Sequence, residues 1–144
     1  MRLVGLAALC SLCLLMAAPT PGAATDAKPG SLSAYVTVAG APGDGEQALA
    51  AALARRLSAL GVKQATAFEA DIYDIQGTVR VAPAKAGKET VTIVWVVLDP
   101  SGNQLGVTRQ SKDVRKGALD KKWGAAADAA AEAAAADILK LLPQ

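Results

Sequence analysis

The chain has 144 residues, with 15 lysines and arginines, 13 acidic residues, no histidine and two cysteines. Both cysteines, Cys10 and Cys13, lie in an apolar run at the start, and cleavage after that run removes them. The remaining chain then holds no thiol nucleophile, no disulfide, no Cys/His zinc site and no histidine acid–base catalyst. Its near-neutral charge gives no general attraction to nucleic acid, so no nucleic-acid partner is expected.

The first 24 residues have the pattern of a cleaved secretory signal peptide. Arg2 supplies the basic start, residues 3–18 are apolar, and small residues precede a cleavage position after Ala24. A membrane-spanning helix needs roughly 20 apolar residues, which is longer than this run. Lipidated cysteines usually follow a small residue, but here Leu9 and Leu12 precede the two cysteines. The sequence therefore predicts a periplasmic or secreted protein rather than a membrane-anchored protein or a lipoprotein, with no transmembrane segment in the mature chain.

A polar leader is expected at residues 25–32, followed by one domain at residues 33–144. Residues 33–38 alternate in the manner of a strand, with Ala34, Val36 and Val38 on one face. A loop rich in glycine follows and leads into the clearest element of the chain.

The first helix is predicted from leucines that recur at helical spacing and form one apolar stripe, namely Leu49, Leu53, Leu57 and Leu60. Asp44 is the expected N-cap, and Gly61 is expected to end the helix. Arg55 and Arg56 fall off the stripe and are expected to face solvent.

Three further strands are expected after this helix, together with a weakly indicated one at residues 62–68. Residues 72–81 alternate between apolar and polar side chains, which predicts a strand with one wet face. Residues 91–98 are apolar on both faces, which is typical of a strand covered on both sides or covered on one side by a partner. A hairpin turn at residues 99–103 leads to a return strand that begins near Leu105.

The last helix is predicted to run from about residue 120 to 142. One face is shared by Trp123, Ala127, Ala130, Ala134, Ile138 and Leu141. Trp95 and Trp123 are interpreted as core residues, with an exposed anchor for a partner as the alternative. The predicted fold class is α+β: a small mixed or antiparallel sheet with two helices packed on it, in the order β-α-β-β-β-α.

A glycine motif, Gly43-x-Gly45-x-x-Ala48, matches the form of a dinucleotide-binding loop between a strand and a helix. Asp44 and Glu46 place negative charge where a pyrophosphate would lie. The next unit is also a hairpin rather than a second βα crossover. A capped turn is therefore the better interpretation, and no cofactor is expected.

An acidic cluster, formed by Glu69, Asp71 and Asp74, lies at the start of the strand expected near residues 72–81. Carboxylates grouped in this way can bind a hard cation or act as acid and base. The spacing of a calcium loop is absent, and short acids favour turns. A solvated strand entry is therefore the better interpretation, with neither a metal site nor a catalytic site expected.

A basic segment is the one charge asymmetry of the chain. Its six cations are Arg109, Lys112, Arg115, Lys116, Lys121 and Lys122. Such a segment can meet an acidic protein, an anionic cell-wall component or lipid headgroups, or it can be a solvated loop that leads into a helix. Because no aromatic residues interleave with it, a groove for single-stranded nucleic acid is not expected. These six residues are the predicted partner-binding residues.

Short motifs also suggest a relationship. The helix end Leu60-Gly61-Val62, the run Ala70-Asp71-Ile72-Tyr73-Asp74-Ile75-Gln76-Gly77-Thr78-Val79 and the hairpin Leu98-Asp99-Pro100-Ser101-Gly102 carry it. In these the chain resembles the α+β domain of the TolB amino-terminal region, the curli secretion lipoprotein and the lipoprotein activators of cell-wall synthases. It is also similar to small secreted alphaproteobacterial envelope proteins of unknown function. The resemblance implies an accessory protein that binds other proteins in the periplasm.

The sequence thus favours a non-catalytic periplasmic adaptor that binds an envelope protein through its sheet edge or its basic segment. The alternative is a periplasmic small-ligand-binding protein with a pocket between the sheet and the helices. An enzyme that uses only carboxylates, lysines and hydroxyls is the third and least favoured hypothesis. The sequence does not indicate an oligomeric state.

Overall fold

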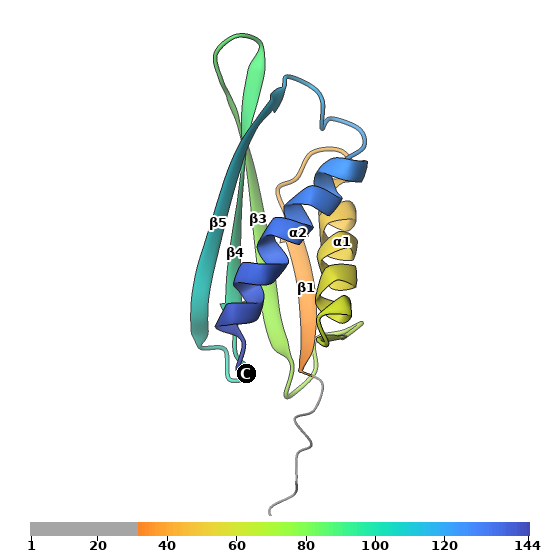
Figure 1. The fold of residues 1–144 in the computed structure, drawn as a ribbon, viewed down its shortest axis with the longest axis vertical. Coiled ribbons are helices and arrows are strands. Elements are labelled where there is room, and N and C mark those ends of the chain that lie inside the picture. The colour runs from red at the N-terminus through yellow and green to blue at the C-terminus, as the bar shows by residue number, and fades with distance from the viewer. Residues whose placement is uncertain (1–31) are drawn as a thin grey trace, which may run out of the picture. The chain divides into compact units, whose positions relative to one another are not determined.

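The computed structural model describes residues 32–144, so the predicted signal peptide and all but the last residue of the predicted leader lie outside the described residues. A five-stranded sheet and two helices form in the predicted α+β order (Figure 1). Their bounds are β1 Ser33–Ala39, α1 Gly45–Ala59, β2 Lys63–Gln64, β3 Tyr73–Pro83, β4 Lys88–Leu98, β5 Gln104–Arg115 and α2 Gly124–Leu141. The predicted fold class is confirmed.

The sheet is mixed, with the strand order β2-β1-β3-β4-β5. Strand β1 pairs in parallel with β2 and with β3, whereas β3, β4 and β5 form an antiparallel meander. A parallel pair needs a crossover, which the segment containing α1 provides between β1 and β3. The weakly indicated strand at residues 62–68 is reduced to the two-residue strand β2.

Both helices cover the same face of the sheet (Figure 1). Helix α1 packs on β1 and β2, helix α2 packs on β4 and β5, and the two helices contact each other. The core lies between these layers and includes Leu49, Leu53, Leu57, Ile75, Val79, Ile93, Trp95, Val97, Ala131, Ala134 and Ile138. The prediction that both tryptophans are core residues is confirmed, since Trp95 is fully buried and Trp123 nearly so.

The predicted leucine stripe is right for three residues and wrong for the fourth. Leu49, Leu53 and Leu57 are fully buried, whereas Leu60 is 50% exposed. Leu60 is the C-cap residue, and Gly61 turns the chain there with a φ of 92°. Val62 then enters the core instead, and its N–H donates to the Leu57 carbonyl at 2.9 Å.

Trp123 explains the glycine motif before α1. An added Cβ at Gly45 would lie 2.4 Å from the indole ring of Trp123, so the ring can pack there only because position 45 is glycine. The indole Nε1–H donates to the Pro42 carbonyl at 2.8 Å. Asp44 occupies the N-cap position as predicted, but its carboxylate accepts the Trp123 backbone N–H at 2.8 Å and makes no capping bond.

The start of the last helix was predicted too early. Helix α2 begins at Gly124, and residues 116–123 form a loop that ends at Trp123, the N-cap residue. That loop is tied to the start of α1, since the Lys121 carbonyl accepts the Asp44 N–H at 3.0 Å. A tertiary contact therefore sets this helix boundary, because the local sequence alone allows helix from residue 120 onward.

Candidate functional site

No helix or strand described in residues 32–144 covers the face of the sheet opposite the helices, and we call it the open face. Strand β4 alternates between buried residues on the helix side and half-buried residues on the open side. Its apolar pattern was predicted to mean cover on both sides, or cover by a partner on one side, and within residues 32–144 only the helix side is covered. The open face of β4 is therefore the first candidate surface for binding.

The strand register groups five apolar side chains on or beside this open face, and we call them the apolar patch: Val94, Val96, Leu98, Leu105 and Val107. Val96 lies opposite Val107, which is 48% exposed. Leu105 is 40% exposed and lies at the irregular start of the β4–β5 pairing, where the register shifts. None of the five belongs to the core cluster. Covering them with another surface would remove apolar area from water, which is favourable.

Two arginines border the apolar patch in a shallow groove of about 330 Å³, which we call the arginine groove. It is lined by Thr78, Arg80, Thr92, Val94 and Arg109. Arg80 pairs in register with Thr92, and Arg109 pairs with Val94, so the two arginines flank β4 from opposite sides. Strands two positions apart in a sheet are about 10 Å apart, which lets both guanidinium groups contact one extended chain.

The arginines of this groove have no ion-pair partner among residues 32–144. The nearby hydroxyl groups are bonded to each other, since Thr92 Oγ1 and Ser111 Oγ lie 2.9 Å apart. Each guanidinium presents a planar set of donors that matches a carboxylate or a phosphate. The groove therefore favours an anionic group next to an apolar one.

Strand β5 forms a long free edge, because it pairs only with β4 among the described strands. Its edge carries a register shift near one end and cations along its length, among them Arg109, Lys112 and Arg115. Bulges and charged side chains on an edge oppose pairing with another strand. The open face is consequently a better candidate surface than the edge.

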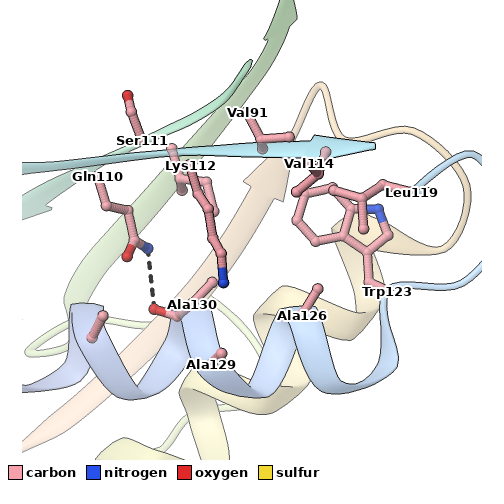
Figure 2. Close-up of a pocket in the computed structure, with 12 residues that line it drawn as sticks. Val91, Gln110, Ser111, Lys112, Val114, Leu119, Trp123, Ala126, Ala129 and Ala130 are labelled. Atoms are coloured by element: carbon pink, nitrogen blue, oxygen red, sulfur yellow. Dashed lines mark hydrogen bonds between the residues drawn. The ribbon is translucent and has the colours of Figure 1, made fainter. Parts of the chain in front are cut away.

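A second hollow lies on the helix side, between the end of the sheet and α2 (Figure 2). We call it the alanine groove, with a volume of about 400 Å³, and it is lined by Val91, Ile93, Gln110, Ser111, Lys112, Val114, Leu119, Trp123, Ala126, Ala129, Ala130 and Ala133. The four alanines of α2 form one wall, because their short side chains stop at Cβ. Most of the lining is apolar.

Two polar side chains of β5 reach across the alanine groove toward α2 (Figure 2). Gln110 Nε2 donates to the Ala130 carbonyl at 3.1 Å and so ties the strand to the helix. Lys112 is the only charged residue among those that line the groove, and it has no ion-pair partner within residues 32–144. The groove therefore combines apolar walls with one ammonium group.

The structure divides the six predicted partner-binding cations among different surfaces. Arg109 lies on the open face in the arginine groove, whereas Lys112 lines the alanine groove on the helix side. Arg115 ends β5, while Lys116, Lys121 and Lys122 lie exposed in the loop that precedes α2. The segment is continuous in sequence but does not form one charged face.

Sequence reasoning missed the open-face role of Arg80 and Val107. The sequence predicted a polar face for β3 and apolar residues on both faces of β4, but it did not show that the two strands are neighbours. The pairing of β3 with β4 places Arg80 next to Thr92 on the open face. Val107 needed the register of β5 as well.

The acidic cluster is a strand entry in the structure. Asp71 has a positive φ of 67°, as short acids in turns often do, and Gln76 Nε2 donates to Asp74 Oδ2 at 2.6 Å. No group of three or more side chains able to hold a metal ion lies within residues 32–144. Neither of the two helices described for this chain is long and apolar enough to cross a membrane.

No protein-family model and no curated protein matches this sequence. Solved structures do share its fold. A point variant of PelC from Paraburkholderia phytofirmans, a dodecamer, matches with a TM-score of 0.51 at 21% identity, over 80% of this chain and 90% of that chain. An uncharacterised protein matches with a TM-score of 0.52 at 14% identity, over 76% and 90% of the two chains.

A minor lipoprotein from Acinetobacter baumannii is similar at a TM-score of 0.43 and 14% identity, over 74% of this chain and 91% of that chain. At these identities the similarity to PelC and to the uncharacterised protein concerns the fold alone. The narrower resemblance to the TolB type of domain stays a prediction.

Proposed function

We propose that this chain is a non-catalytic accessory protein of the bacterial periplasm that binds an envelope protein through the open face of its sheet. One observation supports the proposal above the others: both helices cover one face, and an apolar patch lies on the other. The export pattern and the resemblance to envelope domains support the compartment, and the lack of histidine and of any cysteine beyond residue 13 supports a non-catalytic role.

The chemistry of the open face favours an acidic protein partner. Covering Val94, Val96 and Val107 removes apolar area from water, which is the main driving force for association. Arg80 and Arg109 border that area and favour a partner with carboxylates beside its own apolar residues. Of the predicted cations, Arg109 is then the one that belongs to the contact.

The partner is an envelope protein in this proposal, and an anionic cell-wall component is the competing occupant. A polymer of that kind would use the arginines but would leave the apolar patch exposed. A second copy of this chain is a further competitor, since the structural neighbour PelC is a dodecamer. In two copies packed face to face, the arginines of one copy can meet Asp74 or Asp113 on the open face of the other, so the composition of the crosslinked adduct has to separate this arrangement from an envelope protein.

Site-specific photocrosslinking in living cells tests the proposal. A photoreactive residue is placed at Val107, which is 48% exposed on the open face, and the matched control is Leu60, which is 50% exposed at the end of α1. We expect one protein adduct from position 107 and none from position 60. The adduct is expected to weaken at least tenfold when Arg80→Glu and Arg109→Glu are combined.

The adduct's composition separates the competing occupants. Equal adducts from positions 107 and 60 would contradict the open face as the binding surface. An adduct that consists of two copies of this chain, or of a cell-wall polymer, would contradict an envelope protein as the partner.

A second candidate function is the binding of a small ligand. The alanine groove favours it, since its volume of about 400 Å³ falls in the usual range of ligand pockets, roughly 300–1,000 Å³. The groove and the open face lie on opposite sides of the sheet, so the two functions can be tested separately.

A further inference from the structure

We propose that the alanine groove binds a single-chain amphiphile with an anionic headgroup, with the chain along α2 and the headgroup at Lys112. The inference deepens the second candidate function, the binding of a small ligand, because it names the chemical class of that ligand. It does not depend on the open face or on a protein partner.

The apolar walls of the groove favour a narrow apolar chain. Its floor consists of side chains that the core already holds in place, since Val91 is 5% exposed, Ile93 4% and Trp123 3%. Ala126 and Ala130 on the opposite wall are partly buried and pack against the core. The space is thus bounded by rigid apolar surface on both sides, and an alkyl chain there contacts carbon on both sides.

Both ends of the groove are defined by contacts. The hydrogen bond from Gln110 to the Ala130 carbonyl joins strand and helix at one end. At the other end the ring of Trp123 is fixed by its bond to the Pro42 carbonyl and lies next to Leu119 (Figure 2). These contacts join α2 and the loop before it to β5 and to the loop before α1.

The ammonium group of Lys112 favours a negatively charged ligand. Its side chain extends from β5 into the space between the strand and the helix (Figure 2). Among the residues that line the groove there is no carboxylate, and within residues 32–144 no ion pair involves Lys112. An ammonium group that reaches into an apolar space favours a ligand whose charged end is an anion.

Fluorescence titration with three probes tests the inference. Dodecanoate carries both chain and charge, dodecyl maltoside carries a similar chain without charge, and acetate carries the charge without the chain. Trp123 lines the groove while Trp95 does not, so a saturable change of tryptophan emission reports occupation. We expect dodecanoate to bind below its micelle concentration, dodecyl maltoside to bind about tenfold more weakly, and acetate not to bind.

Two variants distinguish a binding groove from a packing gap. Lys112→Gln removes the charge and is expected to weaken dodecanoate about tenfold while leaving dodecyl maltoside unchanged. Ala130→Leu fills the groove and is expected to abolish binding of both. Ala136→Leu is the matched control, because Ala136 is an exposed alanine of α2 outside the lining, and it is expected to bind as the parent does.

The outcomes separate this inference from the function on which it rests. Equal binding of dodecanoate and dodecyl maltoside, unaffected by Lys112→Gln, would overturn the anionic class and keep a small-ligand function. If neither dodecanoate nor dodecyl maltoside binds saturably, the inference is overturned. If the Ala130→Leu variant binds dodecanoate as well as the parent does, the ligand binds outside the alanine groove and the inference is also overturned. Crosslinking from Val107, on the opposite face, is independent of all these results.

Discussion

Single residues at the start of the two helices link parts of the chain that are far apart in sequence. The Asp44 carboxylate accepts the backbone N–H of Trp123, and the Trp123 indole donates to the Pro42 carbonyl. The ring also fills the space that Gly45 leaves. One tryptophan therefore fixes the loop before α1 and the first turn of α2 together.

Asp44→Ala is expected to lower the free energy of unfolding by about 1–2 kcal/mol, because it leaves the partly buried Trp123 N–H without its acceptor. Asp44→Asn keeps an oxygen at the same position and is expected to lower it by less than about 1 kcal/mol. Urea denaturation followed by tryptophan fluorescence measures both. Equal losses for the two variants would show that the charge of Asp44, rather than its hydrogen bond, matters.

Gly77 is required by its neighbour on β4. An added Cβ would lie 2.5 Å from Cζ3 of Trp95, which is fully buried and opposite Gly77 in the register. Gly77→Ala is expected to lower the free energy of unfolding by about 1–3 kcal/mol through overpacking. Combining it with Trp95→Phe removes the clash, so the two changes together are expected to cost less than their sum. An additive result from thermal denaturation would contradict the contact.

At the scale of elements, helix α1 is held by three buried leucines of its apolar stripe. Leu53→Ala is expected to lower the free energy of unfolding by about 2–5 kcal/mol, because it opens a cavity against the sheet. Leu60→Ala is the control, since Leu60 is 50% exposed, and is expected to cost less than about 1 kcal/mol. Similar losses in guanidinium denaturation would show that Leu60 also packs in the core.

The turn between β4 and β5 is organised by one carboxylate. Asp99 accepts three hydrogen bonds: from the Asn103 side chain at 3.1 Å, from the Asn103 N–H at 2.8 Å and from the Ser101 N–H at 2.8 Å. The bond from the Asn103 side chain, and after it the bond from the Asn103 N–H, holds the pKa of Asp99 below its ordinary value of 3.8. The charged form is therefore favoured in the folded state.

Asn103→Ala is expected to raise the pKa of Asp99 toward 3.8, because it removes the largest cause of the shift. Since the folded pKa is depressed, the stabilisation is present above the unfolded pKa and is lost as the pH falls through the folded pKa. Ser101→Ala keeps its backbone donor and is expected to leave the pKa low. Carbon-detected NMR titration of the carboxyl group measures both, and an unchanged midpoint with Asn103→Ala would contradict the assignment.

Elements whose signals are local could be predicted from the sequence. The stripe through Leu57 and the hairpin turn at residues 99–103 both follow from side-chain spacing and turn chemistry. The end of α1 at Gly61 was also right, because glycine readily adopts the positive φ that ends a helix. These features depend only on residues close together in the chain.

Features that depend on tertiary contacts could not be predicted in the same way. Leu60 shares the helical period with its buried neighbours, but the chain leaves the helix there and Val62 takes the core position. The spacing of Trp123 predicts that it belongs to one face of the last helix. The helix begins after it because its N–H donates to Asp44, in the loop before α1. The two grooves need the register of three strands and the placement of α2.

At the scale of the whole molecule, the sheet separates two surfaces with different chemistry. The helix side contains the core and the alanine groove, with the single ammonium group of Lys112 at that groove. The open side contains the apolar patch and the arginine groove. The basic segment, which is one run of sequence, therefore contributes to both sides and to the loop before α2.

This division predicts which cations govern the salt dependence of partner binding. Capture of the crosslinked envelope protein is expected to weaken as salt rises, because Arg80 and Arg109 are exposed and salt screens charges at the surface. Replacing both arginines with glutamine is expected to weaken capture at low salt and to remove most of its salt dependence.

The matched control replaces Lys121 and Lys122, exposed cations of the loop before α2, with glutamine and removes the same charge. It is expected to leave both capture and its salt dependence unchanged. Both double variants are expected to unfold at the temperature of the parent, since none of the four residues is in the core. Capture measured by surface plasmon resonance over a series of salt concentrations decides between them. If the lysine variant loses capture and the arginine variant keeps it, the partner contacts the loop before α2 and not the arginine groove.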